Sequence, residues 1–247
     1  MILKKCIAYD NPCYTESPKM CGKPYGIVVH STGCDNPYIM RYVQPSATDP
    51  NHTTILQDIG KNIYANDLNH ADADICMHGI VGKNKKDIVE VYQTLPYNIC
   101  CWGCGRGEKG SYNYDPTACI QFEICEDDLE DKRYFEKAMK AAVEYCAYLC
   151  KMYDIPVDYI VSHKEACAKG YASNHGDPEN WLTIYGKDMN WFRSQVQKIL
   201  SAQETPSTSE LYYCVQVGAF KDRQNAESYL KELKAAGFSG YITTKGV

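Results

Sequence analysis

The segment Lys23–Tyr42, KPYGIVVHSTGCDNPYIMRY, decides how the chain is organised. Within it, Gly26–Val29 is an unbroken apolar run that ends on His30, and small polar residues follow, as at the exit of a buried strand. A histidine in this position can reach a cleft while its backbone is held rigid, as a metal ligand or catalytic base requires. Considered alone, such a histidine is more often a structural residue whose ring is hydrogen-bonded to a backbone group than a ligand or a base. The remaining sequence has to decide between these interpretations.

Size and composition restrict the class of protein. The chain has 247 residues, enough for one domain with its own core and a small appendage. It carries 26 basic and 31 acidic residues without a long basic block, so we expect no nucleic-acid partner. No signal-peptide-like start and no apolar run of membrane-spanning length is visible. We therefore expect synthesis in the cytoplasm, no transmembrane segment, and a monomer.

Fourteen cysteines are spread through the chain. Many of them stand singly or lie in apolar segments, as do Cys146 and Cys150. This distribution favours reduced thiols used as small core side chains over the alternative, a disulfide framework. The cluster 100–104, CCWGC, contains one CxxC pair, but structural zinc sites usually combine two such pairs. We interpret this cluster as a loop.

The pattern of apolar residues predicts alternating strands and helices. The expected strands cover residues 26–29, 74–81, 88–94, 118–125 and 157–162. The expected helices cover residues 54–66, 131–153 and 183–200. The runs 74–81 and 88–94 are separated by a short turn and should form a hairpin. The polar segment 163–181 contains glycine and proline and is predicted to be an irregular loop that folds back over a cleft.

The predicted strand 118–125, ACIQFEIC, places a carboxylate in its middle. Side chains alternate along a strand, so Phe122 and its apolar neighbours point to one face and Glu123 points to the other. Carboxylates are depleted in strands and costly to bury unless paired, which makes Glu123 a candidate functional residue. Glu126 begins an acidic run that we interpret as the solvated start of the next helix.

Two predicted strands that lie far apart in the sequence end in histidine. The run 157–162 is followed by His163, and together with His30 this indicates a shared cleft at one end of a sheet. The loop after His163 supplies His175 and Asp177. Two histidines and one carboxylate are a standard ligand set for a catalytic zinc, which lowers the pKa of bound water to about 7. His30, His163 and Asp177 can provide such a set.

The remaining polar residues suggest how an amide would be cleaved at such a site. Glu123 can take a proton from water and pass it to a leaving amine. His175 can then donate to the oxyanion of a tetrahedral intermediate, an interaction typically worth about 3–4 kcal/mol. Six histidines permit other trios, so the residues alone leave the ligand set open.

A family resemblance narrows this choice. Six ordered motifs within residues 1–200 carry it: GIVVHSTGCDNPYIMRYVQP, ICMHGIVG, CWGCG, IQFEICEDD, VSHKEA and ASNHGDPENW. The sequence resembles the type 2 N-acetylmuramoyl-L-alanine amidases, the zinc amidases related to peptidoglycan-recognition proteins and common as endolysins and autolysins. The resemblance implies an α/β fold with a mixed central sheet flanked by helices, and a Zn2+ on the sheet. It also implies hydrolysis of the amide between N-acetylmuramic acid and L-alanine in peptidoglycan, and so action on the cell wall.

The resemblance also assigns roles by position. It makes His30, His163 and Asp177 the metal ligands, Glu123 the catalytic strand glutamate, and His175 the residue that stabilises the transition state. The loop between His163 and Asp177 is longer than in the compact relatives, so His175 in place of His163 as the second histidine ligand stays an alternative.

One departure and one rival function remain. Gly103 stands where many relatives have the histidine of a Trp-His-x-Gly motif, which puts one substrate contact in doubt. The rival function is a catalytically silent module that only binds peptidoglycan in the same groove. The complete ligand set together with Glu123 favours catalysis.

The C-terminal residues form a separate segment. The stretch 201–209, SAQETPSTS, is polar and aperiodic and is predicted to be a linker. Beyond it we expect a small βαβ unit, with strands at 211–217 and 240–244 around a helix at 224–236 that Gly237 caps. This unit resembles the first half of a sporulation-related repeat, a peptidoglycan-binding module. The expected domains are a zinc amidase domain at 1–200, the linker at 201–209, and a partial sporulation-related repeat at 210–247.

Overall fold

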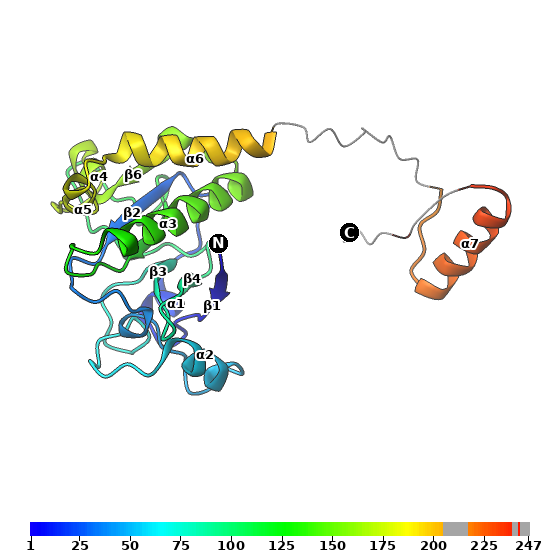
Figure 1. Ribbon diagram of the computed structural model, residues 1–247, viewed down its shortest axis with the longest axis horizontal. Coiled ribbons are helices and arrows are strands. Elements are labelled where there is room, and N and C mark those ends of the chain that lie inside the picture. The colour runs from blue at the N-terminus through cyan, green and yellow to red at the C-terminus, as the bar shows by residue number, and fades with distance from the viewer. Residues whose placement is uncertain (205–216, 239–241, 243–247) are drawn as a thin grey trace. The chain divides into compact units, whose positions relative to one another are not determined.

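The computed structural model describes residues 1–204, 217–238 and 242, and the chain divides into two compact units, 1–205 and 206–247 (Figure 1). The strands are β1 (Leu3–Lys5), β2 (Ile27–Ser31), β3 (Gly79–Lys83), β4 (Val89–Gln93), β5 (Ile120–Ile124) and β6 (Ile160–Ser162). The helices are α1 (Pro12–Glu16), α2 (His52–Ile59), α3 (Lys132–Tyr153), α4 (His163–Lys169), α5 (Glu179–Ile184), α6 (Met189–Glu204) and α7 (Arg223–Ala235). Two 3-10 turns are η1 (Ile39–Arg41) and η2 (Val157–Tyr159).

A six-stranded mixed sheet forms the centre of the first unit, in the order β1-β4-β3-β5-β2-β6. The pair β3–β4 is antiparallel and forms the predicted hairpin, whereas the other neighbouring strands are parallel. The hairpin is shorter than predicted: β3 begins at Gly79, and residues 74–78 before it are not in a strand, with the backbone N–H of Cys76 donating to the carbonyl of Trp102. The mixed α/β fold expected from the sequence is confirmed.

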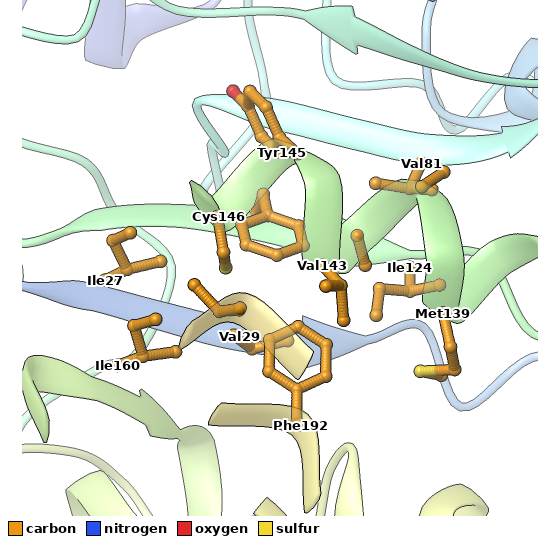
Figure 2. Packing of buried hydrophobic residues seen from close by; sticks show 14 of the residues in the cluster. Ile27, Val29, Val81, Ile124, Met139, Val143, Tyr145, Cys146, Ile160 and Phe192 are labelled. Carbon is orange, nitrogen blue, oxygen red and sulfur yellow. The ribbon is translucent and has the colours of Figure 1, made fainter. Parts of the chain in front are cut away.

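Helices α3 and α6 run side by side along one face of the sheet (Figure 1). Alternate residues of the central strands face these helices, and Val29 of β2 and Phe122 of β5 lie in the core beneath them. Figure 2 shows Val143 and Cys146 of α3 and Phe192 of α6 in this cluster. Complete burial of such side chains contributes about 1.5–3 kcal/mol each. The other residues of these strands, which alternate with the core residues, therefore point to the opposite face.

Helix α3 matches its prediction closely. It begins after Asp131, whose carboxylate accepts hydrogen bonds from the backbone N–H groups of Arg133 and Tyr134. It ends at Asp154, which adopts the left-handed conformation at φ 50°. The amphipathic pattern predicted the buried face, which includes Leu149. This long, well-capped helix packs on one face of the sheet, so polar side chains of the central strands are found on the opposite face.

The segment after β6 is more ordered than its polar sequence suggests. Residues 163–181 were predicted to be an irregular loop, and that prediction was wrong for α4 and for the start of α5. Ser162 and Glu165 form a capping box, in which each side chain accepts a hydrogen bond from the other residue's backbone, and this starts α4 at His163. Trp181 of α5 is fully buried against Phe135 of α3. Only the stretch between the two helices, 170–178, is irregular.

Further predicted boundaries differ from the structure. The expected strand 157–162 begins with the 3-10 turn η2, so β6 covers only Ile160–Ser162. Helix α2 ends at Ile59, and Ile63, which suggested a longer helix, is exposed. Helix α6 begins at Met189 and not at residue 183, because a turn through Gly186, at φ +64°, separates it from α5. It continues to Glu204 and so extends four residues into the predicted linker. The rest of the linker lies outside the described residues.

The second unit contains the predicted helix, here α7. Its N-cap is Asp222, whose side chain accepts hydrogen bonds from the backbone N–H groups of residues 224 and 225. Gly237 follows the helix at φ +89°, as expected of a C-terminal glycine. The two predicted strands of this unit lie outside the described residues, except for residues 217 and 242. None of the helices in the described part of the chain is apolar over a length that would cross a bilayer.

The cysteines contribute to the core. The described residues include 13 cysteines, all free, and ten of these are buried. Cys146 and Cys150 pack on the sheet from α3, which confirms the prediction that cysteine serves as a small core side chain. Burial raises the pKa of Cys150 to about 12. The cluster 100–104 is a loop, as predicted.

Candidate active site

Strands β2 and β5 place the first two candidate residues next to each other. In the parallel pairing of these strands, His30 lies opposite Glu123. Both side chains occupy positions that alternate with the core residues Val29 and Phe122, so they lie on the face opposite α3. His30 is 1% exposed, and β2 continues through it to Ser31, one residue beyond the expected exit.

Two later segments bring the remaining candidates to His30. His163 opens α4 directly after β6, the strand beside β2, and its Nδ1 lies 3.0 Å from Nδ1 of His30. Asp177 returns from the irregular stretch after α4, with Oδ2 3.3 Å from Nδ1 of His30 and Oδ1 3.6 Å from Nδ1 of His163. The ligand atoms of these three residues all lie within 4.8 Å of one another, and no other such group occurs among the described residues. Two imidazole nitrogens and one carboxylate are donors that suit zinc.

His175 lies at the rim of this group. Its ring stacks on that of His163 at 4.5 Å, its side chain is 61% exposed, and its Nδ1 is 4.0 Å from Oδ1 of Asp177. The compact three-residue group contains His163 and not His175. This geometry favours His163 as the second histidine ligand, and His175 lies exposed beside the group.

Glu123 has an unpaired, buried carboxyl oxygen. Its Oε2 has no hydrogen-bond partner in the described part of the chain. Burial raises the pKa of Glu123 to about 7; a positive charge on His30 opposes this rise, and the negative charges of Asp177 and Glu126 add to it. A carboxyl group with a pKa near neutrality can both accept and return a proton at physiological pH.

The charges of the three clustered residues are set by the same environment. Burial and the neighbouring His30 lower the pKa of His163 to about 4. Burial opposes protonation of His30 as well, but the hydrogen bond to Asp177 and the charge of Glu123 outweigh it and raise its pKa. The pKa of Asp177 is lowered: burial would raise it, but the hydrogen bond and charge of His30 prevail. An ionised Asp177 and a neutral His163 are the forms that bind metal.

Sequence reasoning missed several residues at this site. Glu126 was predicted to be solvated, and this was wrong: it is buried, it accepts a hydrogen bond from the hydroxyl of Ser31, and burial raises its pKa. Its backbone N–H donates to Thr32 Oγ1 at 3.0 Å, which holds the chain beside the end of β2 and away from water. Gln121, fully buried, places Oε1 3.1 Å from Nε2 of His30.

Two other polar side chains support the group. The hydroxyl of Ser173 lies 3.3 Å from Nε2 of His163 and donates to the carbonyl of Cys104. His78 is fully buried, with its ring nitrogens bonded to the backbone N–H of Gln121 and to the carbonyl of Ile99. Burial lowers the pKa of His78 to about 4, so it serves as a neutral core residue.

A mixed α/β sheet that carries a His-His-Asp group beside an unpaired carboxyl is a candidate metal centre of the kind that hydrolases use. The chain belongs to the N-acetylmuramoyl-L-alanine amidase family, Amidase_2, whose model matches residues 21–180. The model of a second family, the SPOR domain, matches residues 210–247. Both family assignments agree with the resemblances found in the sequence.

Individual relatives were found by sequence and by structure. The curated N-acetylmuramoyl-L-alanine amidase CwlA of a Bacillus species is 35% identical over 83 residues, which cover 34% of this chain and 32% of that relative. The match therefore spans about a third of the relative's length. The hydrolase AmiA of Staphylococcus aureus, solved with its ligand, matches with a TM-score of 0.53 and 18% identity over 83% of this chain and 85% of AmiA. The PlyG catalytic domain matches with a TM-score of 0.48 and 24% identity over 85% of this chain and all of that domain.

Proposed function

We propose that this chain is a zinc-dependent enzyme that hydrolyses the amide between N-acetylmuramic acid and L-alanine in peptidoglycan. The observation that carries the proposal is the convergence of His30, His163 and Asp177 beside the unpaired carboxyl of Glu123. Membership of the amidase family supports the reaction type. The result is lysis or remodelling of the cell wall.

The donor atoms fit a zinc ion. Nδ1 of His30 and Nδ1 of His163 face each other at 3.0 Å, and a carboxylate oxygen of Asp177 approaches both. Two imidazole nitrogens and a carboxylate that converge in this way are a donor set that suits zinc, and both nitrogen lone pairs become available to a cation when His30 loses its Nδ1 proton. When bound, zinc supplies Lewis-acid chemistry and lowers the pKa of water to about 7.

Two residues of the chain handle protons and charge. Glu123 lies opposite His30 and, at a pKa of about 7, accepts a proton from the attacking water and returns it to the leaving amine of L-alanine. His175, stacked on His163 and exposed, stabilises the negative oxygen of the tetrahedral intermediate by donating a hydrogen bond. The substrate partner is the glycan strand with its stem peptide.

The two units divide the work. Residues 1–204, through the end of α6, form the catalytic domain, residues 205–209 remain as the linker, and residues 210–247 are a peptidoglycan-binding segment of the sporulation-related type. The SPOR match at 210–247 supports the last role. The enzyme acts as a monomer at the cell wall, which it reaches by release or by export.

Digestion of purified cell walls tests the reaction. The protein should release stem peptides with new L-alanine amino termini and no new reducing sugar ends, measured by amino-end labelling and a reducing-sugar assay. New reducing ends would instead indicate a glycosidase. Binding to cell walls without release of any product would indicate a recognition module and not an enzyme.

Variants separate metal binding from turnover. His30→Ala and Asp177→Ala should each lose bound zinc, measured by elemental analysis, together with activity. Glu123→Gln should keep zinc and lose turnover, because only the proton acceptor changes. His70→Ala, a histidine outside the site, is the matched control and should retain both. A Glu123→Gln protein of normal rate would remove Glu123 from the mechanism.

A further inference from the structure

A buried chain of side-chain amides connects the loop at 103–104 to His30. Asn113 Oδ1 accepts hydrogen bonds from the backbone N–H groups of Gly103 and Cys104, at 3.2 and 3.1 Å. It also accepts from Nε2 of Gln121 at 2.8 Å. Gln121 Oε1 then lies 3.1 Å from Nε2 of His30. The side chains of Asn113, Gln121 and His30 are buried, so water does not replace any of these hydrogen-bond partners.

The direction of every hydrogen bond in this chain follows from the backbone at its far end. Backbone N–H groups can only donate, so the atom of Asn113 that meets Gly103 and Cys104 is its oxygen. That oxygen requires a donor from Gln121, and the carbonyl of Tyr112, 3.3 Å from the same Nε2, requires one as well. Gln121 therefore presents its oxygen to His30, and the bond at 3.1 Å forms only when Nε2 of His30 carries the proton.

The other nitrogen of His30 is under the opposite influence. Its Nδ1 lies 3.3 Å from Oδ2 of Asp177 and 3.0 Å from Nδ1 of His163, and in the metal-free protein both of these acceptors attract a proton to Nδ1. A metal ligand needs Nδ1 free of a proton, because the lone pair makes the bond. Asp177 and Gln121 thus favour different tautomers of the same ring, and only the one favoured by Gln121 is ready to bind metal.

We propose that Gln121 is a positioning residue that holds His30 as its Nε2–H tautomer and so presents the Nδ1 lone pair to the metal. Asn113 and the 103–104 backbone orient Gln121 for this task. The effect on the metal rests on the proposed zinc site, whereas the tautomer is a property of the metal-free protein. A measurement of the tautomer can therefore contradict the role of Gln121 without contradicting the zinc site, and a failure of the zinc site leaves the tautomer to be measured.

Gly103 makes room for this arrangement. A Cβ atom at residue 103 would lie 2.5 Å from Oε1 of Gln121, closer than atoms approach without a shift. A side chain at 103 therefore displaces the oxygen that accepts from His30. We therefore connect two features of the sequence. The departure from the Trp-His-x-Gly motif at Gly103 accompanies the amide of Gln121, because that amide occupies the space that a side chain at residue 103 would need.

The test measures the tautomer directly in metal-free protein labelled with 15N-histidine. Two-bond 1H–15N correlation spectra, at an alkaline pH where His30 is neutral, distinguish a proton on Nε2 from one on Nδ1. Gln121→Met removes the acceptor with little change of shape, and the Nε2–H population of His30 should fall relative to wild type. Zinc affinity, from competition with a chelator, should fall about 10–100-fold, as is typical when such a supporting partner is lost. An unchanged tautomer population would overturn the proposal.

Two further variants separate positioning from general stability. Gln121→Glu keeps an oxygen facing His30 but removes the donor to Asn113, so it should be less stable to urea than wild type yet retain the Nε2–H tautomer and zinc affinity. Loss of that tautomer in Gln121→Glu would mean that Gln121 acts only structurally. Gly103→Ala keeps Gln121 and displaces its oxygen, and it should shift the tautomer even if Gln121→Met does not fold. A Gly103→Ala protein with the wild-type tautomer and affinity would refute the role assigned to Gly103 and Gln121 together.

Discussion

The unpaired carboxyl of Glu123 should make the metal-free protein less stable as the pH rises. Its pKa is about 7 in the folded chain against an ordinary value of 4.5. Between these pH values the folded state keeps the proton and the unfolded state releases it, so the free energy of unfolding falls with rising pH. At 1.36 kcal/mol per pKa unit, the full loss above pH 7 is about 3 kcal/mol. Below pH 4.5 the carboxyl is protonated in both states and the loss vanishes.

The substitution Glu123→Gln isolates this contribution, because glutamine is neutral at every pH. We compare the free energies of unfolding in urea of the metal-free wild type and variant from about pH 4 to about pH 9. The free energy of unfolding of the variant minus that of wild type should rise by about 3 kcal/mol across this range. Any constant cost of the glutamine cancels in this comparison between pH values. Glu136→Gln, at an exposed position of α3, controls for the general effect of removing one carboxylate. If wild type and Glu123→Gln change in parallel with pH, the carboxyl of Glu123 is not held protonated by burial.

Substitutions at three other positions test the scaffold by the same urea assay. Trp181→Ala should cost about 3–5 kcal/mol, because the ring is fully buried and packs on Phe135; a cost below 1 kcal/mol would mean that α5 is not part of the core. Asp131→Ala should cost about 1 kcal/mol by removing the N-cap of α3, and Asp131→Asn should restore most of it. Gly107→Ala should cost about 1–3 kcal/mol, because its Cβ would lie 2.4 Å from the carbonyl oxygen of Gly170, and a neutral result would show that the two loops separate easily.

The parts of the fold that could be predicted are those with a strong local pattern. The alternation around Glu123 identified β5 and both of its faces, and the helical period of 131–153 identified α3 nearly to the residue. The histidine at the end of β2 followed from the contrast between an apolar run and a polar loop. These signals lie within a few residues of the features they predict.

What could not be predicted depends on partners far away in the sequence. Gln121 was visible only as one polar residue in a strand, because its role depends on Asn113 and on the loop at 103–104. Glu126 was predicted to be exposed to solvent because acidic residues follow it in the sequence. In the structure it is buried, and it is hydrogen-bonded to Ser31 and Thr32. Helix α4 was missed for a different reason: its capping box was readable, but the surrounding polar residues and glycines masked it.

The buried cysteines have a consequence for how long the enzyme lasts outside a reducing environment. Folded, the chain hides ten of the thiols in its described residues, and burial keeps those of Cys6 and Cys150 protonated and unreactive. Each excursion to the unfolded state exposes them all at once to oxidants and to one another, and mixed pairing then blocks the return. In an oxidising medium, loss of the buried thiols is therefore limited by how rarely the protein unfolds. Cys21 is exposed and reacts without unfolding, so the slow phase of labelling by a thiol reagent in native buffer, after the accessible cysteines have reacted, measures that lifetime.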